Sequence, residues 1–564
     1  MAQHVDLLER EDTVESEELS GTARQVVGRR KVLGVIGGGI ALAGCSTIPG
    51  APPVPGVPGA PPAPGAPPAP GAPPPPPVPV PPASTGPVPT VLSADAGLHL
   101  LRRAAFGFGA ADVAEMAALG PAGWLAKQLD PASIDDGALE GYLGRYPALG
   151  LTAQQIDDRD YDDGGRQRAD EDLVEATVAR QVFSQRKLFE KVVEFWSNHF
   201  NVQAPSDDSY GRKTVEDRAV IRAGALGRFA DLLLADAKSP AMLRYLNQEQ
   251  SRADGENVPN ENYARELMEL HTLGAGNGYT EDDVKELSRL LTGMTRNDAR
   301  EYVFDENRHD QNGPIRVMTF ESANASPATA EAEIDRFVDY LAHLPQTAAY
   351  LSFKLARHFV SDTPPQSLVD SLAAAYLAND TQIVPWLQAL FTSPEFNSSV
   401  GQKVRRPMED IAQTVVSLGL TLQGDPENDE RLLGHADYRQ HAPFAWPTPD
   451  GYPDTASAWM PSGGLLASWN LHWNMAHGDY DNMLSPADDA IAALLGATPP
   501  ATAGELVDTV ALGLVYQQLA ADHHAAVLEY LGVAAADPVD ADAAADLAKA
   551  AAATIWNSPY HFQR

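Results

Sequence analysis

The chain has 564 residues, with 41 Lys and Arg against 76 Asp and Glu, a formal net charge of −35, 44% hydrophobic residues and one cysteine. So acidic a chain is not expected to bind nucleic acid, because the phosphate backbone attracts basic surfaces. A single cysteine excludes a disulfide framework and a cysteine-based zinc site, while the length allows two or more ordinary domains.

Residues 1–44 have the layout of an export signal. A polar, acidic segment precedes the basic cluster Arg29-Arg30-Lys31, and an uncharged run follows over residues 34–44. This run is too short to span a bilayer, which takes about 20 apolar residues. The two arginines resemble those of a twin-arginine (Tat) export signal, and general secretion is the alternative route. We therefore expect the protein to be exported.

The apolar run ends in Leu42-Ala43-Gly44-Cys45, which resembles a lipobox, the motif whose cysteine is diacylated once the signal is removed. The alternative is a chance apolar run followed by a buried cysteine. We favour the lipobox, because the one cysteine of the chain stands where the lipid is attached. Two acyl chains hold a protein stably on a membrane. The expected location is the extracytoplasmic face of the cell membrane.

Residues 45–92 predict a linker that starts at the lipidated cysteine. The segment 46–90 contains 21 prolines, including the near-repeat PGAPPAPGAPPAPGAPP at 58–74. Proline fixes φ and lacks an N–H, so a disordered or extended polyproline II chain is expected. A ligand for proline-binding modules is one interpretation. A spacer between membrane and folded domain is the one we favour.

Residues 93–564 predict an all-α domain. Alternating strand patterns are nearly absent, and only 302–304 and 316–320 could pair in a small hairpin around Asn312-Gly313. Apolar residues recur at helical spacing in 95–104, 110–119, 172–196, 330–341, 382–391, 406–418 and 505–519.

Two helix ends share a Ser-Pro-aromatic pattern, at 393–396 and 558–562. They could mark two related helical lobes, with a boundary near 424–434. They could equally reflect a common way to end a helix, because proline disfavours helix in the residue before it.

Two segments of the predicted helices combine acids, amides and histidines. The first, 195–202, ends an amphipathic helix at His199, which could be a metal ligand or a proton shuttle, although this segment alone favours a core histidine. The second, 260–274, places Glu266 and Glu269 one turn apart, where they could chelate a metal or form a solvated, arginine-paired face. His271 lies about 200° round the helix from Glu269 and cannot join the same ion.

Two further segments are rich in charge. Residues 304–310 bring His309 and Asp310 together in a predicted loop, where functional sites are often assembled; a solvated polar loop is the alternative. Lys354 and His358 lie at i and i+4 near a predicted helix end, where the helix dipole favours cations.

Taken in chain order, these segments resemble the bacterial family catalogued as Domain of Unknown Function 1800. The resemblance covers residues 93–564, and the string Asn-Glu-Asn-Tyr-Ala-Arg-Glu-Leu at 260–267 is its most specific part. It implies an exported, mostly helical protein and no established reaction. The other segments that carry it are 101–107, 195–200, 240–246, 279–293, 308–310, 357–360 and 403–407.

Two functions fit this pattern. One is a metal-dependent enzyme of the cell envelope, with a divalent transition metal such as Zn, Fe, Mn or Ni. Its candidate catalytic and metal-binding residues are His199, Glu266, Glu269, His309 and Asp310. The alternative is a non-catalytic lipoprotein that binds or scaffolds an envelope protein or glycan. Trp469 and Trp473 could give it an aromatic contact face, although such spacing more often belongs to a core.

Overall fold

The computed structural model describes residues 90–159, 165–206, 211–253, 257–421, 432–434, 436–437, 439–477, 487–496 and 498–564. The predicted signal with Arg29 and Arg30, Cys45 and the linker as far as residue 89 lie outside these ranges, as does most of the predicted boundary at 424–434. Among the described residues, no helix combines the length and apolarity of a membrane span.

The fold is all-α, as predicted. The first half contains α1 (Ala96–Ala104), α2 (Ala110–Gln128), α3 (Gly137–Leu143), α4 (Ala153–Asp157), α5 (Gln167–Phe183), α6 (Lys187–His199), α7 (Arg212–Glu216), α8 (Arg222–Gly224), α9 (Phe229–Ala237), α10 (Pro240–Tyr245), α11 (Glu261–Met268) and α12 (Glu281–Leu290). The second half contains α13 (Pro327–Ala342), α14 (Pro345–Phe359), α15 (Gln366–Ala378), α16 (Ile383–Phe391), α17 (Pro394–Asn397), α18 (Pro407–Ser417), α20 (Ala456–Trp459), α21 (Ser462–His477), α22 (Ala487–Leu495), α23 (Ala503–Leu514), α24 (Ala521–Leu531), α25 (Ala541–Trp556) and α26 (Pro559–Phe562).

Short helical turns join these helices. Four are 3-10 turns: η1 (Pro131–Ser133), η2 (Pro147–Gly150), η5 (Gln248–Gln250) and η7 (Glu306–Arg308). Two are π-helical, η4 (Asp217–Ile221) and η6 (Glu269–Leu273), and π-turns are frequent at functional sites.

Local capping explains several helix starts. The side chain of Asp95 accepts a hydrogen bond from the N–H of Leu98, which starts α1. Thr280 and Asp283 form the predicted capping box of α12. The predicted run 172–196 is instead two helices, α5 and α6. The break between them is held by Asp136, whose carboxylate accepts hydrogen bonds from Ser184 and from the N–H of Gln185.

The few strands correct the predicted hairpin. Residues 302–304 are a strand as predicted, whereas 316–320 contains the end of one strand, a turn at 318–319 and the start of the next strand. Strand β1 (Met294–Arg296) pairs antiparallel with β2 (Tyr302–Phe304), and β3 (Ile315–Val317) pairs with β4 (Phe320–Ser322). Short turns thus decide the pairing, and the Asn312-Gly313 turn lies between two hairpins.

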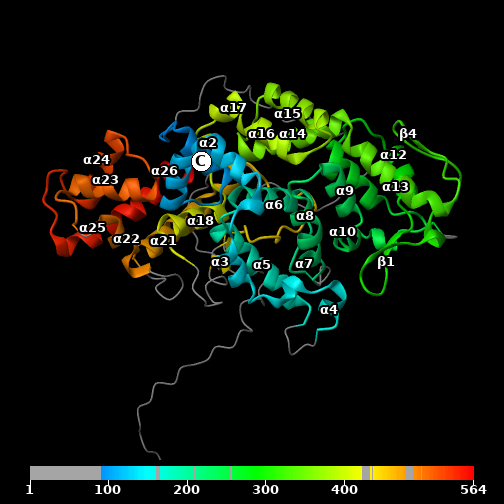
Figure 1. Ribbon diagram of the computed structural model, residues 1–564, viewed down its shortest axis with the longest axis horizontal. Helices are drawn as coiled ribbons and strands as arrows, with labels where there is room; N and C mark the ends of the chain where they lie inside the picture. Colours follow the sequence, from blue (N-terminus) through cyan, green and yellow to red (C-terminus); the bar gives the residue numbers. More distant parts are fainter. Residues whose placement is uncertain are drawn as a thin grey trace, which may run out of the picture. The chain divides into compact units, whose positions relative to one another are not determined.

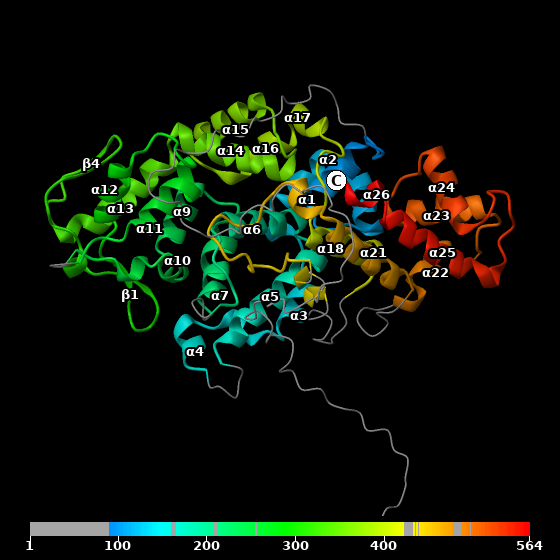
Figure 2. The same ribbon diagram turned by 180° about the vertical axis from the view of Figure 1, so that it is seen from behind.

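The buried apolar side chains form two clusters. The larger draws on helices from α1 to α17 and contains the fully buried Trp124, Trp196 and Trp386. The second is built on α18 and α21–α26, with contributions from α5, and contains Trp556. Figures 1 and 2 show α22–α25 at one end of the helical part and the hairpins with α12 and α13 at the other. Helices α5, α6 and α18 lie between them.

Candidate functional site

The C-terminal end of α6 holds a loop by its main chain. The side-chain amide of Asn201 donates to the carbonyl oxygens of Trp446 and Thr448, at 3.0 and 2.8 Å. Asn198 donates to the carbonyl of Tyr452 at 3.1 Å and accepts from its N–H at 2.6 Å. We call residues 446–452 the clamped loop.

His199 follows Asn198 directly and is buried. Its Nε2 lies 3.1 Å from the carbonyl oxygen of His271, to which it donates, so Nδ1 carries the lone pair. That lone pair accepts a hydrogen bond from Lys354 Nζ at 2.9 Å. Burial and the charge of Lys354 hold the pKa of His199 well below its ordinary value. His199 is therefore a neutral acceptor that orients an amine.

The π-turn η6 explains why His271 meets His199. Residues Glu269–Leu273 widen the helix at its end and turn the His271 ring into the core, where it is fully buried. Burial and the charge of Lys354 lower the pKa of His271 to about 3. As predicted, His271 does not share a ligand position with Glu269.

Lys354 lies on α14 and is half-buried. Burial lowers the pKa of its ammonium group to about 8, and the negative charges of Asp450 and Asp454 partly offset this. The ring of Tyr350 lies 5.6 Å from Nζ. From the sequence, Lys354 was predicted only to lie near a helix end. In the structure it is an amine that changes charge close to neutral pH.

Acidic groups surround this amine. Burial and the charge of Glu269 raise the pKa of Glu266 to about 7, Arg265 counteracts this, and Asp450 raises it further. Arg265 makes its close ion pair elsewhere, with Glu281 at 2.6 Å. Because Asp450 acts on both Glu266 and Lys354, the two groups share one electrostatic neighbourhood.

We call this neighbourhood, with Lys354, His199, Glu266, Glu269 and Asp450, the Lys354 site. Two hydrogen bonds fix other parts of it. Glu269 accepts a hydrogen bond from the Tyr279 hydroxyl at 3.0 Å. The exposed carboxylate of Asp450, in the clamped loop, accepts one from the indole N–H of Trp446 at 3.1 Å. The predicted residues His199, Glu266 and Glu269 thus gather around Lys354 and Asp450, which the sequence did not single out for chemistry.

His309 and Asp310 belong to a different part of the fold. The His309 ring nitrogens lie 2.8 Å from the carbonyl oxygen of Thr292 and 2.9 Å from the amide oxygen of Asn324. Asp310 pairs with Arg289 at 3.1 Å. Their polar atoms are used to fasten the loop before β3 to α12.

A cavity lies along α6, lined by Gln181, Ser197 and His441 and also by Asn198, Asn201 and Tyr452, which take part in holding the clamped loop. Its two main acids are neutralised by arginines. Glu190 pairs with Arg222 at 2.6 Å, and Glu194 pairs with Arg406 at 2.8 Å. Its chemistry therefore differs from that of the Lys354 site, where Lys354 has a pKa of about 8 and Glu266 one of about 7.

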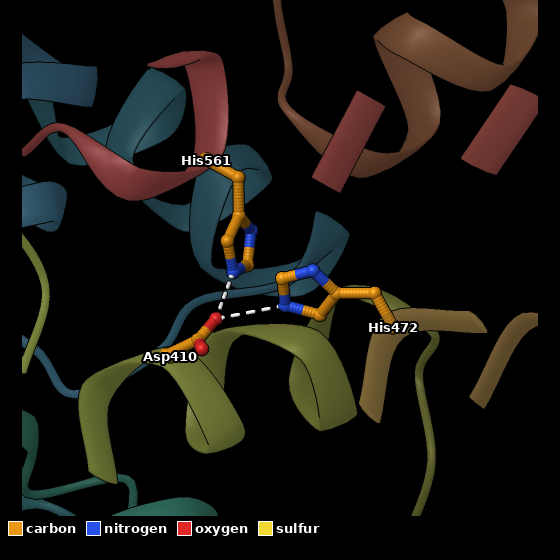
Figure 3. Close-up of side chains that lie close together, drawn as sticks. All are labelled: Asp410, His472 and His561. Carbon is orange, nitrogen blue, oxygen red and sulfur yellow. Dashed lines mark hydrogen bonds and ion pairs between the residues drawn. The ribbon is translucent and has the colours of Figure 1, made fainter. Parts of the chain in front are cut away.

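The predicted metal ligands do not meet. Among the described residues, one group of three or more His, Cys, Asp or Glu has its ligand atoms within 4.8 Å of one another: Asp410, His472 and His561 (Figure 3). His199, Glu266, Glu269 and His309 form no such group. The nitrogens of both candidate histidines are already engaged, by His271, Lys354, Thr292 and Asn324.

The Asp410 group gave no signal in the sequence, because its members come from three helices. Asp410 lies on α18, His472 on α21 and His561 on α26. The Ser-Pro-aromatic pattern pointed to the segment that carries His561, but only as a helix end.

A family model described as "Protein of unknown function (DUF1800)" matches residues 99–564. No protein of curated function and no solved structure matches the chain significantly.

Proposed function

We propose that this chain, which belongs to the DUF1800 family of proteins of unknown function, is an exported, lipid-anchored acid–base enzyme of the cell envelope. The basic cluster at Arg29 and Arg30 and the lipobox that ends in Cys45 support the location. The proline-rich linker supports a folded domain held at a distance from the membrane. The Lys354 site supports the enzymatic activity.

One observation carries the enzymatic part: Lys354 Nζ, half-buried, lies 2.9 Å from a neutral His199 nitrogen, and the charges of Asp450 and Asp454 act on it. An oriented amine of this kind can take a proton from a substrate, while Glu266 can supply one. Pairs of groups that titrate near working pH are the usual means of acid–base catalysis.

The charge of the site suggests the substrate class. The Lys354 site contains the carboxyl groups of Glu266, Glu269 and Asp450, and Arg265 beside them is paired with Glu281, so we expect anionic substrates to be disfavoured. A hydroxyl-rich molecule such as an envelope glycan suits these groups, because carboxylates and an amine can exchange hydrogen bonds and protons with hydroxyls.

The test compares variants on envelope glycans. Purified full chain is incubated with a glycan fraction of the cell envelope, and products are detected by mass spectrometry. We expect Lys354→Met and Glu266→Gln to lower the rate about 10²–10⁴-fold, the usual contribution of a general acid or base. Lys285→Met, at an exposed lysine of α12, is the matched control. Equal rates in wild type and Lys354→Met would defeat the proposal.

A non-catalytic binding lipoprotein is the second candidate, and one observation favours it. Trp469 and Trp473 on α21 are 45% and 44% exposed, with Leu466 beside them at 57%. Such spacing more often belongs to a core, but in the structure these tryptophans lie on the surface. Aromatic faces bind sugars and proteins. If this function holds, Trp469→Ala with Trp473→Ala abolishes glycan binding, and Lys354→Met leaves it intact.

The location has its own test. Cys45→Ser should move the protein from the membrane to the soluble fraction. Replacement of Arg29 and Arg30 by lysine should block export if the Tat route is used. Retention of the Cys45→Ser variant in washed membranes would contradict the lipid anchor.

A further inference from the structure

A buried group of two histidines and one aspartate joins three helices, α18, α21 and α26. Figure 3 shows the carboxylate of Asp410 between the imidazoles of His472 and His561. One oxygen, Oδ1, lies 2.9 Å from His472 Nε2 and 2.6 Å from His561 Nε2. All three side chains are fully buried.

The hydrogen bonds of His472 leave one position for a cation. Its Nδ1 lies 2.7 Å from the amide oxygen of Asn557 and donates to it. A doubly protonated imidazole would donate from both nitrogens and need no ion, whereas a neutral one has a single N–H, so its Nε2 presents a lone pair to a carboxylate oxygen, which can only accept. A metal ion between the two removes this repulsion. A second partner at Nδ1 is also the usual arrangement for a histidine that binds a metal.

The carboxylate supports the same role. His561 Nδ1, by contrast, is buried and has no hydrogen-bond partner, so His561 lacks the second partner that His472 has. Arg439 pairs with the second carboxylate oxygen of Asp410 at 2.7 Å, so Oδ1 remains as a single donor. Two imidazoles and one carboxylate oxygen are typical ligands for Zn²⁺ and Fe²⁺.

We propose that Asp410, His472 and His561 bind a divalent transition metal of the Zn²⁺ class. A tetrahedral zinc site with bonds of about 2.0–2.1 Å separates its ligand atoms by about 3.3 Å. The side chains therefore have to part by less than about 1 Å, a rotamer-scale adjustment. Because all three ligands are buried, the ion has a structural role: it fastens α21 and α26 to α18.

The alternative is a metal-free cluster. In that arrangement the Asn557 amide presents its NH₂ to His472, and both imidazoles donate to Asp410. This cluster would need no ion, and chelators would leave its stability unchanged. Metal content and stability therefore distinguish the two.

The experiment uses the purified full chain expressed with added Zn²⁺. After gel filtration, metal is counted by elemental analysis, and Tm is measured before and after chelation and Zn²⁺ addition. We expect about one Zn²⁺ per chain and a Tm that falls on chelation and recovers with Zn²⁺. His472→Gln and His561→Gln should each retain at least tenfold less metal. His99→Gln is the matched control, a buried histidine of α1 that bonds to the carbonyl of Phe396.

If a variant does not fold, the wild-type chain alone decides the test. Replacement of Zn²⁺ by Co²⁺ should then give the visible absorption of nitrogen- and oxygen-bound cobalt. A wild-type chain that retains neither metal, and whose Tm responds to neither, overturns the proposal. So do folded His472→Gln and His561→Gln variants with wild-type metal content.

Discussion

Amine-reactive probes should single out Lys354 near neutral pH. With a pKa of about 8, about a quarter of the Lys354 side chains are uncharged at pH 7.5, against about 0.1% for a lysine at the ordinary 10.5. Only the uncharged amine is nucleophilic, so Lys354 has an advantage of about 240-fold before its partial burial is counted. The perturbation that tests this is a change in the charge around the amine.

Asp450→Asn is that change. Asp450 raises the pKa of Lys354 by attracting the charged form, so its removal should move the midpoint of labelling below pH 8. Asp282→Asn is the control, because Asp282 is an exposed acid that pairs with Lys285 on α12. It should leave the midpoint of Lys354 unchanged.

The assay is reductive methylation at a series of pH values, followed by peptide mass mapping. Lys354→Arg identifies the labelled peptide. The midpoint decides the outcome, because partial burial slows the reaction at every pH alike. A midpoint near 10.5, or one that Asp450→Asn does not lower, would refute the electrostatic account of the Lys354 site.

Two predictions concern the scaffold of this site. Glu409→Gln should lower the free energy of unfolding by about 3–5 kcal/mol, the usual cost of breaking a buried ion pair, because it leaves Lys191 and Arg564 without their shared carboxylate at 2.5 and 2.9 Å. In the wild type these cations hold the pKa of Glu409 well below 4.5 despite its burial. The stabilisation by Glu409 is therefore complete above pH 4.5 and is lost as pH falls through the folded pKa. Urea unfolding should show that the difference in stability between wild type and variant becomes smaller in acid. A loss of stability under 1 kcal/mol at pH 7 contradicts this prediction. Gly451→Ala should cost about 1–3 kcal/mol and displace the clamped loop, since Gly451 has φ +73° and an added Cβ would lie 2.2 Å from the carbonyl oxygen of Asn198. Its measurement is thermal unfolding, and an unchanged Tm would show that the loop yields without strain.

The sequence predicted the features that short segments decide. The helix predicted over 95–104 is α1, which Asp95 starts by a hydrogen bond within its first turn, so a short segment sufficed. The break between α5 and α6 depends on Asp136, which is 48 residues from Ser184. Nothing inside the run 172–196 indicates that break.

The candidate site could be predicted only in part for the same reason. His199, Glu266 and Glu269 stood out because they lie in predicted helical segments that combine acids, amides and histidines. Lys354 meets His199 across 155 residues, and the clamped loop brings Asp450 from still farther along the chain. Contacts of this kind are made by packing, so the residue types alone did not separate the members of the site from His309 and Asp310.

The clamped loop is anchored to the end of α6 through its backbone, while the side chains of Trp446 and Thr448 bond to Asp450 within the loop. Asn198 and Asn201 bond to peptide groups of Trp446, Thr448 and Tyr452, and not to their side chains. The path of the loop and the identity of its side chains are therefore decoupled. Random replacement of positions 446–450 should keep the ribbon in place while changing what it presents to Lys354, which makes this segment a natural starting point for redesigning selectivity.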